Sequence, residues 1–170
     1  MKALQVVNPR SFDRVQIPVP HLPPESTDRI LVRTLWISMC GSDIPFFTGK
    51  TRSRSYPLAP GPPIHECVGE VVESASELFR PGDRVLSIPD EDQGLAEFFL
   101  AQTAKTIKLK ADIEDSGAAC IIQPLSTAMN AMDRMGDVRG KSFAVIGLGS
   151  IGLFFLLARC EERRRCRHRD

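Results

Sequence analysis

Residues 66–110, ECVGEVVESASELFRPGDRVLSIPDEDQGLAEFFLAQTAKTIKLK, contain short runs of β-forming residues separated by turns. The strand-like runs are ECVGEVVES (66–74), PGDRVLSIP (81–89), AEFFLAQ (96–102) and KTIKLK (105–110). Upstream, MKALQVV, DRVQIPVP (13–20) and the longer alternating run RILVRTLWIS (29–38) have the same character. Many short strands at this spacing predict a mainly β protein, an all-β barrel or sandwich.

Two segments interrupt this pattern. Between Cys40 and Ile64 the chain is so rich in glycine and proline that we expect no regular element, only a long surface loop of a kind that is often functional. From Glu114 to Met135 the apolar residues recur at helical spacing, which predicts a helical connector that stops at Gly136.

A glycine motif lies in KSFAVIGLGSIGLFFLLA (141–158), which predicts a buried strand, a turn and an apolar helix. In a dinucleotide-binding turn, Gly147 would permit the tight turn, Gly149 would let the backbone approach a pyrophosphate, and Gly152 would let the helix pack on the strand. The alternatives are a core helix or a membrane anchor over 143–158. The glycines and Ser150 in the middle of the segment count against an anchor.

Cys40, His65 and Glu66 flank the breaker-rich loop, and their side chains are all suitable zinc ligands. On spacing alone, the simpler interpretation is a buried structural cysteine and an unrelated loop histidine.

Composition and charge exclude several classes of protein. Lysine and arginine total 22 against 21 acidic residues, so the whole chain lacks the basic character of a nucleic-acid-binding protein. Five scattered cysteines do not suggest a secreted disulfide framework. The N-terminal residues contain no apolar core of a signal peptide. We therefore expect a cytoplasmic enzyme with neither a nucleic-acid nor a membrane partner.

The motifs together resemble the zinc-dependent medium-chain dehydrogenase/reductase family, which includes alcohol and polyol dehydrogenases. The matching segments, in the family's order, are Cys40-Gly-Ser-Asp43, His65-Glu66-Cys-Val-Gly69, Pro81-Gly-Asp-Arg-Val85, Gly94-Leu-Ala-Glu97, Pro124-Leu-Ser-Thr and Gly147-Leu-Gly-Ser-Ile-Gly152. This resemblance implies a GroES-like β-barrel catalytic domain followed by the first strand, turn and helix of a Rossmann α/β domain. The implied ranges are 1–135 for the catalytic domain with its helical connector, 136–158 for the partial nucleotide-binding unit, and 159–170 for an aberrant basic tail.

The resemblance also implies roles for individual residues. Cys40 and His65 would be ligands of a catalytic zinc, with Glu66 a direct or exchanging ligand. Ser42 would pass the substrate proton away, and Asp43 would orient the ligand histidine. In the intact enzyme, hydride would move between a small-molecule alcohol, polyol or sugar and NAD or NADP.

The sequence departs from the family pattern in its site. Pro45 replaces a histidine that extends the proton relay in many members, and Gln123 replaces a glutamate that is usual in the polyol branch. Residues 86–119 contain no cysteine, so we expect one catalytic zinc and no structural zinc. Ile64 replaces the glycine that usually precedes the His-Glu pair.

The largest departure is the ending. Residues 159–170, RCEERRRCRHRD, hold six arginines and run where a second Rossmann strand is expected. We interpret the chain as C-terminally truncated and inactive in hydride transfer, without the surface that intact relatives use to form homo-oligomers. The principal alternative is a non-catalytic zinc-binding GroES-like module, and a zinc-free reductase of the same superfamily is the closest enzymatic alternative.

Overall fold

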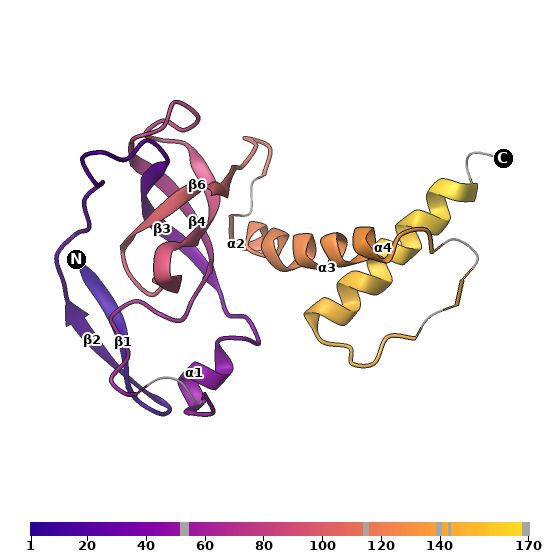
Figure 1. Ribbon diagram of the computed structural model, residues 1–170, viewed down its shortest axis with the longest axis horizontal. Coiled ribbons are helices and arrows are strands. Elements are labelled where there is room, and N and C mark those ends of the chain that lie inside the picture. Colours follow the sequence, from indigo (N-terminus) through magenta and orange to yellow (C-terminus); the bar gives the residue numbers. More distant parts are fainter. Residues whose placement is uncertain (52–54, 114–115, 139–140, 143, 168–170) are drawn as a thin grey trace. The chain divides into compact units, whose positions relative to one another are not determined.

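The computed structural model describes residues 1–51, 55–113, 116–138, 141–142 and 144–167. The chain forms two compact units, Met1–Cys120 and Ile121–Asp170 (Figure 1). The first unit holds the β-strands, and the second holds two helices. Within the described part of the chain, no helix combines the length and the apolar character needed to cross a membrane.

Four antiparallel strands form a closed barrel in the first unit: β3 (Arg29–Ser38), β4 (Glu66–Ser74), β5 (Arg84–Pro89) and β6 (Phe98–Lys108). The predicted bounds of β3 and β4 are confirmed. The two runs predicted at 96–102 and 105–110 belong to the single strand β6, because Thr103 and Ala104 between them include no turn-forming residue.

The first two strands, β1 (Lys2–Asn8) and β2 (Ser11–Gln16), form a separate two-stranded antiparallel sheet. The prediction that the second strand extends to Pro20 is wrong. It ends at Gln16 because Pro18 and Pro20 have no backbone N–H to donate to a neighbouring strand.

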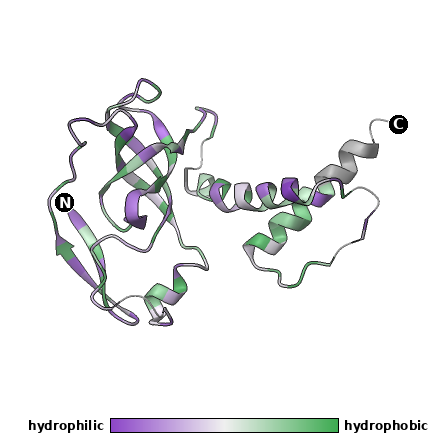
Figure 2. Ribbon diagram, in the orientation of Figure 1, coloured by the Kyte–Doolittle hydropathy of each residue, from purple (hydrophilic) through white to green (hydrophobic). Residues whose placement is uncertain are grey.

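Fully buried apolar side chains from all four barrel strands fill the barrel, and the apolar residues along its strands appear green in Figure 2. The contributing side chains include Ile30, Val32, Val71, Val85 and Phe99. In β3, β4 and β5, buried residues also stand next to one another in the sequence, so both faces of these strands are covered at those positions.

Gly69 marks a close approach between β3 and β4. A Cβ atom at this position would lie 2.3 Å from Val32 Cγ1 and 2.5 Å from the Arg33 carbonyl oxygen. The second contact is with backbone, which cannot move aside as a flexible side chain can. The glycine is therefore required by the packing of the barrel.

The loop from Cys40 to Ile64 is not wholly irregular, contrary to the prediction. A short helix, α1 (Ile44–Thr48), lies within it, with Pro45 in the first turn, where no backbone donor is needed. Gly49 ends the helix in a left-handed conformation, with φ at 80°. A second short helical element, η1 (Asp90–Asp92), follows β5.

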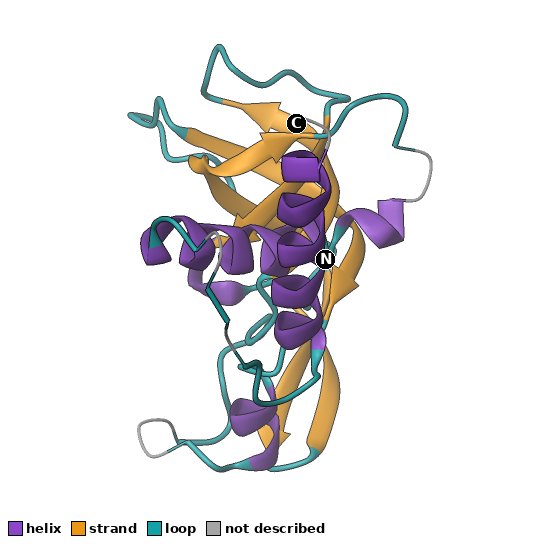
Figure 3. Ribbon diagram, turned by 90° about the vertical axis from the view of Figure 1, so that its right-hand side faces the viewer, coloured by secondary structure: helices purple, strands orange, loops and turns teal. Residues whose placement is uncertain are grey.

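The helical connector predicted over 114–135 consists of two helices, α2 (Ser116–Ala119) in the first unit and α3 (Ile122–Met135) in the second. The predicted stop at Gly136 is confirmed, and this residue has a φ of 68°. Figure 3 shows α3 and the following helix, α4 (Ser150–Arg167), in purple. The basic segment that begins at Arg159 therefore continues a helix as far as Arg167.

The strand predicted before the glycine turn is not assigned among the described residues. Phe143 lies outside them, and residues 144–146 pair with no other strand. A parallel strand is stable only beside other strands of its sheet, and the described part of this unit contains none.

Several apolar side chains of the second unit are accordingly exposed. Ile146 is fully exposed, and Leu153, Leu156 and Leu157 of α4 are also exposed. Val145, Phe154 and Phe155 are half-buried. A surface of this kind favours association with other apolar surfaces.

We expect the isolated 170-residue chain to self-associate through α4 at high protein concentration. Substituting Leu153 and Leu157 together with lysine should raise the concentration at which light scattering begins. The matched control is Thr127→Lys together with Asn130→Lys on exposed positions of α3, which adds the same charge and leaves the apolar surface unchanged. Equal solubility of the two double variants would contradict this account.

We expect Gly69→Ala to lower the free energy of unfolding by about 2–3 kcal/mol, because the new methyl group overlaps the Arg33 backbone. Chemical denaturation followed by tryptophan fluorescence measures the change. Gly41→Ala is the control, since a Cβ there meets no heavy atom within 4 Å. If Gly69→Ala lowered the free energy of unfolding no more than Gly41→Ala, this would show that the two strands can separate to admit a side chain.

Candidate metal centre

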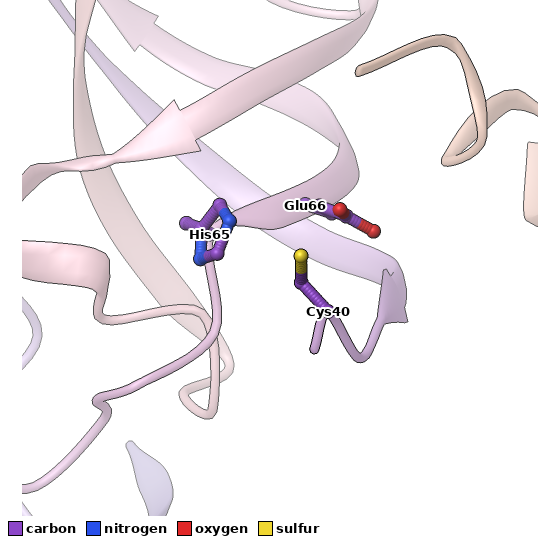
Figure 4. A group of neighbouring side chains, drawn as sticks. All are labelled: Cys40, His65 and Glu66. Atoms are coloured by element: carbon purple, nitrogen blue, oxygen red, sulfur yellow. The ribbon is translucent and has the colours of Figure 1, made fainter. Parts of the chain in front are cut away.

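Cys40, His65 and Glu66 come together at one end of β3 and β4. One potential ligand atom from each lies within 4.8 Å of the others. In Figure 4 the Cys40 Sγ atom points toward the space between the His65 ring and the Glu66 carboxylate. The structure thus brings together the three residues that the sequence singled out.

The register of the barrel explains this convergence. β3 and β4 are antiparallel, and Ser38 at the end of β3 lies opposite Glu66 at the start of β4. Cys40 lies two residues after the end of β3, and His65 directly precedes β4. The antiparallel pairing therefore closes the long loop and brings the two ligand segments together.

Asp43 connects the cysteine and the histidine. Its side chain is buried, with 3% of the residue exposed. The Oδ2 atom accepts a hydrogen bond from the Cys40 backbone N–H at 2.7 Å, and the Oδ1 atom lies 3.2 Å from His65 Nδ1. One carboxylate thus fixes the backbone at Cys40 and the orientation of the His65 ring, which leaves Nε2 as the ring atom for a metal.

The same contact changes the charge of the histidine. The hydrogen bond to Asp43 raises the pKa of His65 from 6.5 to about 9, and burial opposes this rise. The Asp43 charge, the Pro63 backbone and the Asp92 charge act in the same direction as the hydrogen bond. In the metal-free protein at neutral pH, His65 is therefore an imidazolium paired with Asp43.

Glu66 supplies a buried carboxylate, with 2% of the residue exposed. Among the described residues, no ion pair involves Glu66. A buried carboxylate is costly without a compensating charge, so a cation fits this position. Thiolate, imidazole and carboxylate form a donor set that zinc accepts, and a fourth ligand such as water would complete a tetrahedron. The residues present therefore fit a zinc ion.

Ser42 lies in the turn between Cys40 and Asp43, and its side chain is exposed. Its predicted role in proton transfer stays a prediction, as does the predicted ligand role of each member of the cluster. Gln123 lies in α3 of the other unit, where its backbone carbonyl accepts hydrogen bonds from the Ser126 and Thr127 hydroxyls.

The glycine turn has the local features expected of each position. Gly147 adopts the left-handed region with φ at 98°, and a Cβ at Gly152 would lie 2.0 Å from the Gly147 carbonyl oxygen. Gly149 has open space where a side chain would begin. Helix α4 starts at Ser150, directly after this turn. The role of the three glycines in binding a nucleotide stays a prediction.

Sequence reasoning missed the contribution of the η1 segment. Asp92 adds negative charge near His65, and Asp90 forms a 2.5 Å ion pair with Arg29. The Gly94 backbone N–H donates to the Ile64 carbonyl at 2.9 Å, which ties this segment to the residue before His65. The available signal was the acidic run Asp90-Glu91-Asp92, which ends two residues before Gly94.

Residues 26–111 match the family of alcohol dehydrogenase GroES-like domains. These residues include the whole barrel and all three members of the metal cluster. The chain therefore belongs to the family of alcohol dehydrogenase GroES-like domains. Its mainly β fold, with a GroES-like barrel, is also found in solved dehydrogenase structures.

Proteins that are similar to this chain over most of its length include dehydrogenases and dehydrogenase-like proteins. Sorbitol dehydrogenase of Bacillus subtilis (strain 168) is 28% identical over 186 residues, which cover 93% of this chain and 52% of that protein. The zinc-type alcohol dehydrogenase-like protein YdjJ of Escherichia coli (strain K12) is 27% identical over 192 residues, covering 91% and 52%.

Among solved structures, S. aureus TarJ in complex with NADPH has a TM-score of 0.65 at 25% identity, covering 93% of this chain and 50% of that one. The chain spans about half the length of the relatives it matches.

The raised pKa of His65 predicts a pH dependence of stability in the metal-free chain. The folded pKa exceeds the unfolded value, so the contribution of the ion pair is complete below pH 6.5 and is lost as the pH rises through about 9. We expect the loss between pH 7 and 10 to be about 1–2 kcal/mol, reduced by partial solvent screening. Urea denaturation with a chelator present measures it.

His65→Gln is the matched variant for this experiment, because a neutral amide at position 65 cannot titrate. Its free energy of unfolding should change less than that of the parent chain across the same pH range. Parallel pH profiles for the two proteins would contradict the assigned ion pair.

Proposed function

We propose that this chain is the metal- and substrate-binding part of a zinc- and NAD(P)-dependent oxidoreductase that interconverts an alcohol, polyol or sugar with its carbonyl compound. The main support for the proposal is that Cys40, His65 and Glu66 converge on one space. Asp43 orients the His65 ring toward that space. The names of similar proteins, a sorbitol dehydrogenase among them, support a polyol as the substrate class.

In this proposal Cys40, His65 and Glu66 hold one catalytic zinc. Bound there, zinc would act as a Lewis acid toward the substrate oxygen, while a nicotinamide would exchange the hydride. Asp43 keeps the His65 ring in place and compensates positive charge on it. The exposed Ser42 hydroxyl would accept the substrate proton and pass it to water, because Pro45 has no group that could continue a relay.

The second unit would contribute the start of the nucleotide site. Gly147, Gly149 and Gly152, followed by the N-terminus of α4, would approach the pyrophosphate of NAD or NADP. Because such a site also requires neighbouring parallel strands, we propose that the 170-residue chain binds nucleotide weakly and transfers hydride poorly, if at all. We retain 1–135, 136–158 and 159–170 as the proposed functional divisions.

A non-catalytic zinc-binding module is the second candidate. One observation favours it: the barrel and the complete metal cluster lie within a single compact unit, Met1–Cys120. Such a module would bind zinc without nucleotide. In either case we propose a cytoplasmic location, since the five scattered cysteines do not suggest a secreted disulfide framework. We also propose no structural zinc, since residues 86–119 contain no cysteine.

Cobalt(II) tests the proposed metal site, because it accepts the same donor set as zinc and its bond to a thiolate absorbs light. We expect the full chain to bind one equivalent and to show a thiolate-to-cobalt absorption band. Cys40→Ser should abolish the band and weaken binding at least about tenfold. The exposed Cys160→Ser is the matched control and should change neither. A band that survives Cys40→Ser would refute the assignment.

Titration of the zinc-loaded chain with NADH, followed by nicotinamide fluorescence, separates the two candidates. Binding that is weakened by Gly149→Val supports the oxidoreductase, because the new side chain would obstruct the approach of a pyrophosphate. One bound zinc without nucleotide binding supports the non-catalytic module for this chain.

A further inference from the structure

A groove of about 380 Å³ lies on the first unit, and its lining includes none of Cys40, His65 and Glu66. Its walls come from β1, β2, the second half of β3 and residues 94–97. Most of its lining is apolar, including Leu4, Leu35, Trp36 and Leu95. None of the roles proposed above uses this groove.

One edge of β3 runs along the groove. On one side β3 pairs with β4 from Ile30 to Ser38, but on the other side it pairs with β6 only from Arg29 to Arg33. The Thr34 backbone N–H then donates to the Glu97 carbonyl at 2.9 Å. From Leu35 onward, the described residues supply no further strand to this side of β3.

The residues on this edge lack the features that usually protect exposed strands. Backbone N–H and C=O groups point alternately to the two sides of a strand, so an uncovered edge offers donors and acceptors to another strand. Charged residues or proline normally prevent such pairing. Here the edge consists of Leu35, Trp36 and Ile37, and Trp36 and Ile37 are 55% and 43% exposed.

We propose that this segment, Leu35–Ile37, pairs in an antiparallel manner with the same segment of a second copy of the chain. A two-fold axis at Trp36 would place Leu35 opposite the partner subunit's Ile37 and the two tryptophans opposite each other. Apolar and aromatic residues that face each other across strands stabilise a sheet, and this register places no like charges opposite each other.

The rim of the groove also suits a second copy. Lys2 and Arg14 contribute positive charge, and Glu97 contributes negative charge. A surface with both signs can meet its own symmetry mate with opposite charges facing, whereas a strongly acidic or basic partner would meet repulsion at part of this rim. The mixed rim therefore favours self-pairing over a partner of one charge.

Hydrogen exchange of the full chain at increasing protein concentration tests the pairing directly. We expect the amides of residues 35–38 that point away from β4 to exchange about tenfold more slowly at high than at low concentration, because strand pairing would protect them. The amides of this segment that point toward β4 already lie in the paired side of the strand. The double variant of Leu153 and Leu157 to lysine should keep this effect, which separates the β3 edge from association through α4.

In that α4 background we expect sedimentation velocity to show a dimer, and Trp36→Lys should abolish both this dimer and the concentration-dependent protection. The control Leu78→Lys alters another exposed apolar residue of the same unit, outside the groove, and should preserve both. Exchange at 35–38 that does not depend on concentration in the parent chain would overturn the proposal, and this measurement needs no substitution.

Discussion

The candidate site depends on the buried carboxylate of Asp43. Its two oxygens bind the Cys40 backbone and His65 Nδ1, and so connect segments that are separated by the whole 40–64 loop. A carboxylate that is 3% exposed needs such partners, because burying it without compensation would be costly. Asp43 thereby couples the stability of the loop to the geometry of the three potential ligands.

The barrel provides the second constraint. The antiparallel register of β3 and β4 sets the distance between the ends that carry Cys40 and Glu66. Gly69 allows these strands to approach closely, so a residue outside the site contributes to its geometry through packing. The same strand β3 pairs with β6 in the barrel, and beyond that pairing it has a stretch of edge that no described strand covers. It thus serves both the metal cluster and the proposed contact between two copies.

The sequence predicted the barrel strands well because their β-forming residues stand in short runs separated by turn-forming residues, as β3 and β4 illustrate. It failed where tertiary context decides. Residues 144–146 have the composition of a buried strand but have no neighbouring strand among the described residues. The helix α1 was missed because proline was taken only as a breaker, although Pro45 is well accommodated in a first helical turn.

The candidate site was predicted only with the help of ordered motifs, since two potential ligands so far apart in sequence carry little information by themselves. Spacing could not show that Asp43 contacts both ligand segments, or that Asp92 adds charge near His65. Those relations depend on how the loop folds back on the barrel. The sequence also could not predict that part of the β3 edge has no neighbour among the described strands, because a strand's sequence does not reveal how far its neighbour extends.

The central claim is that one zinc ion is held by one thiolate together with nitrogen and oxygen donors. X-ray absorption spectroscopy of the zinc-loaded chain tests it most directly, because sulfur scatters differently from lighter ligands. The account predicts one sulfur at about 2.3 Å and the remaining ligands at about 2.0–2.2 Å. A first shell with no sulfur, or with two or more, would contradict it.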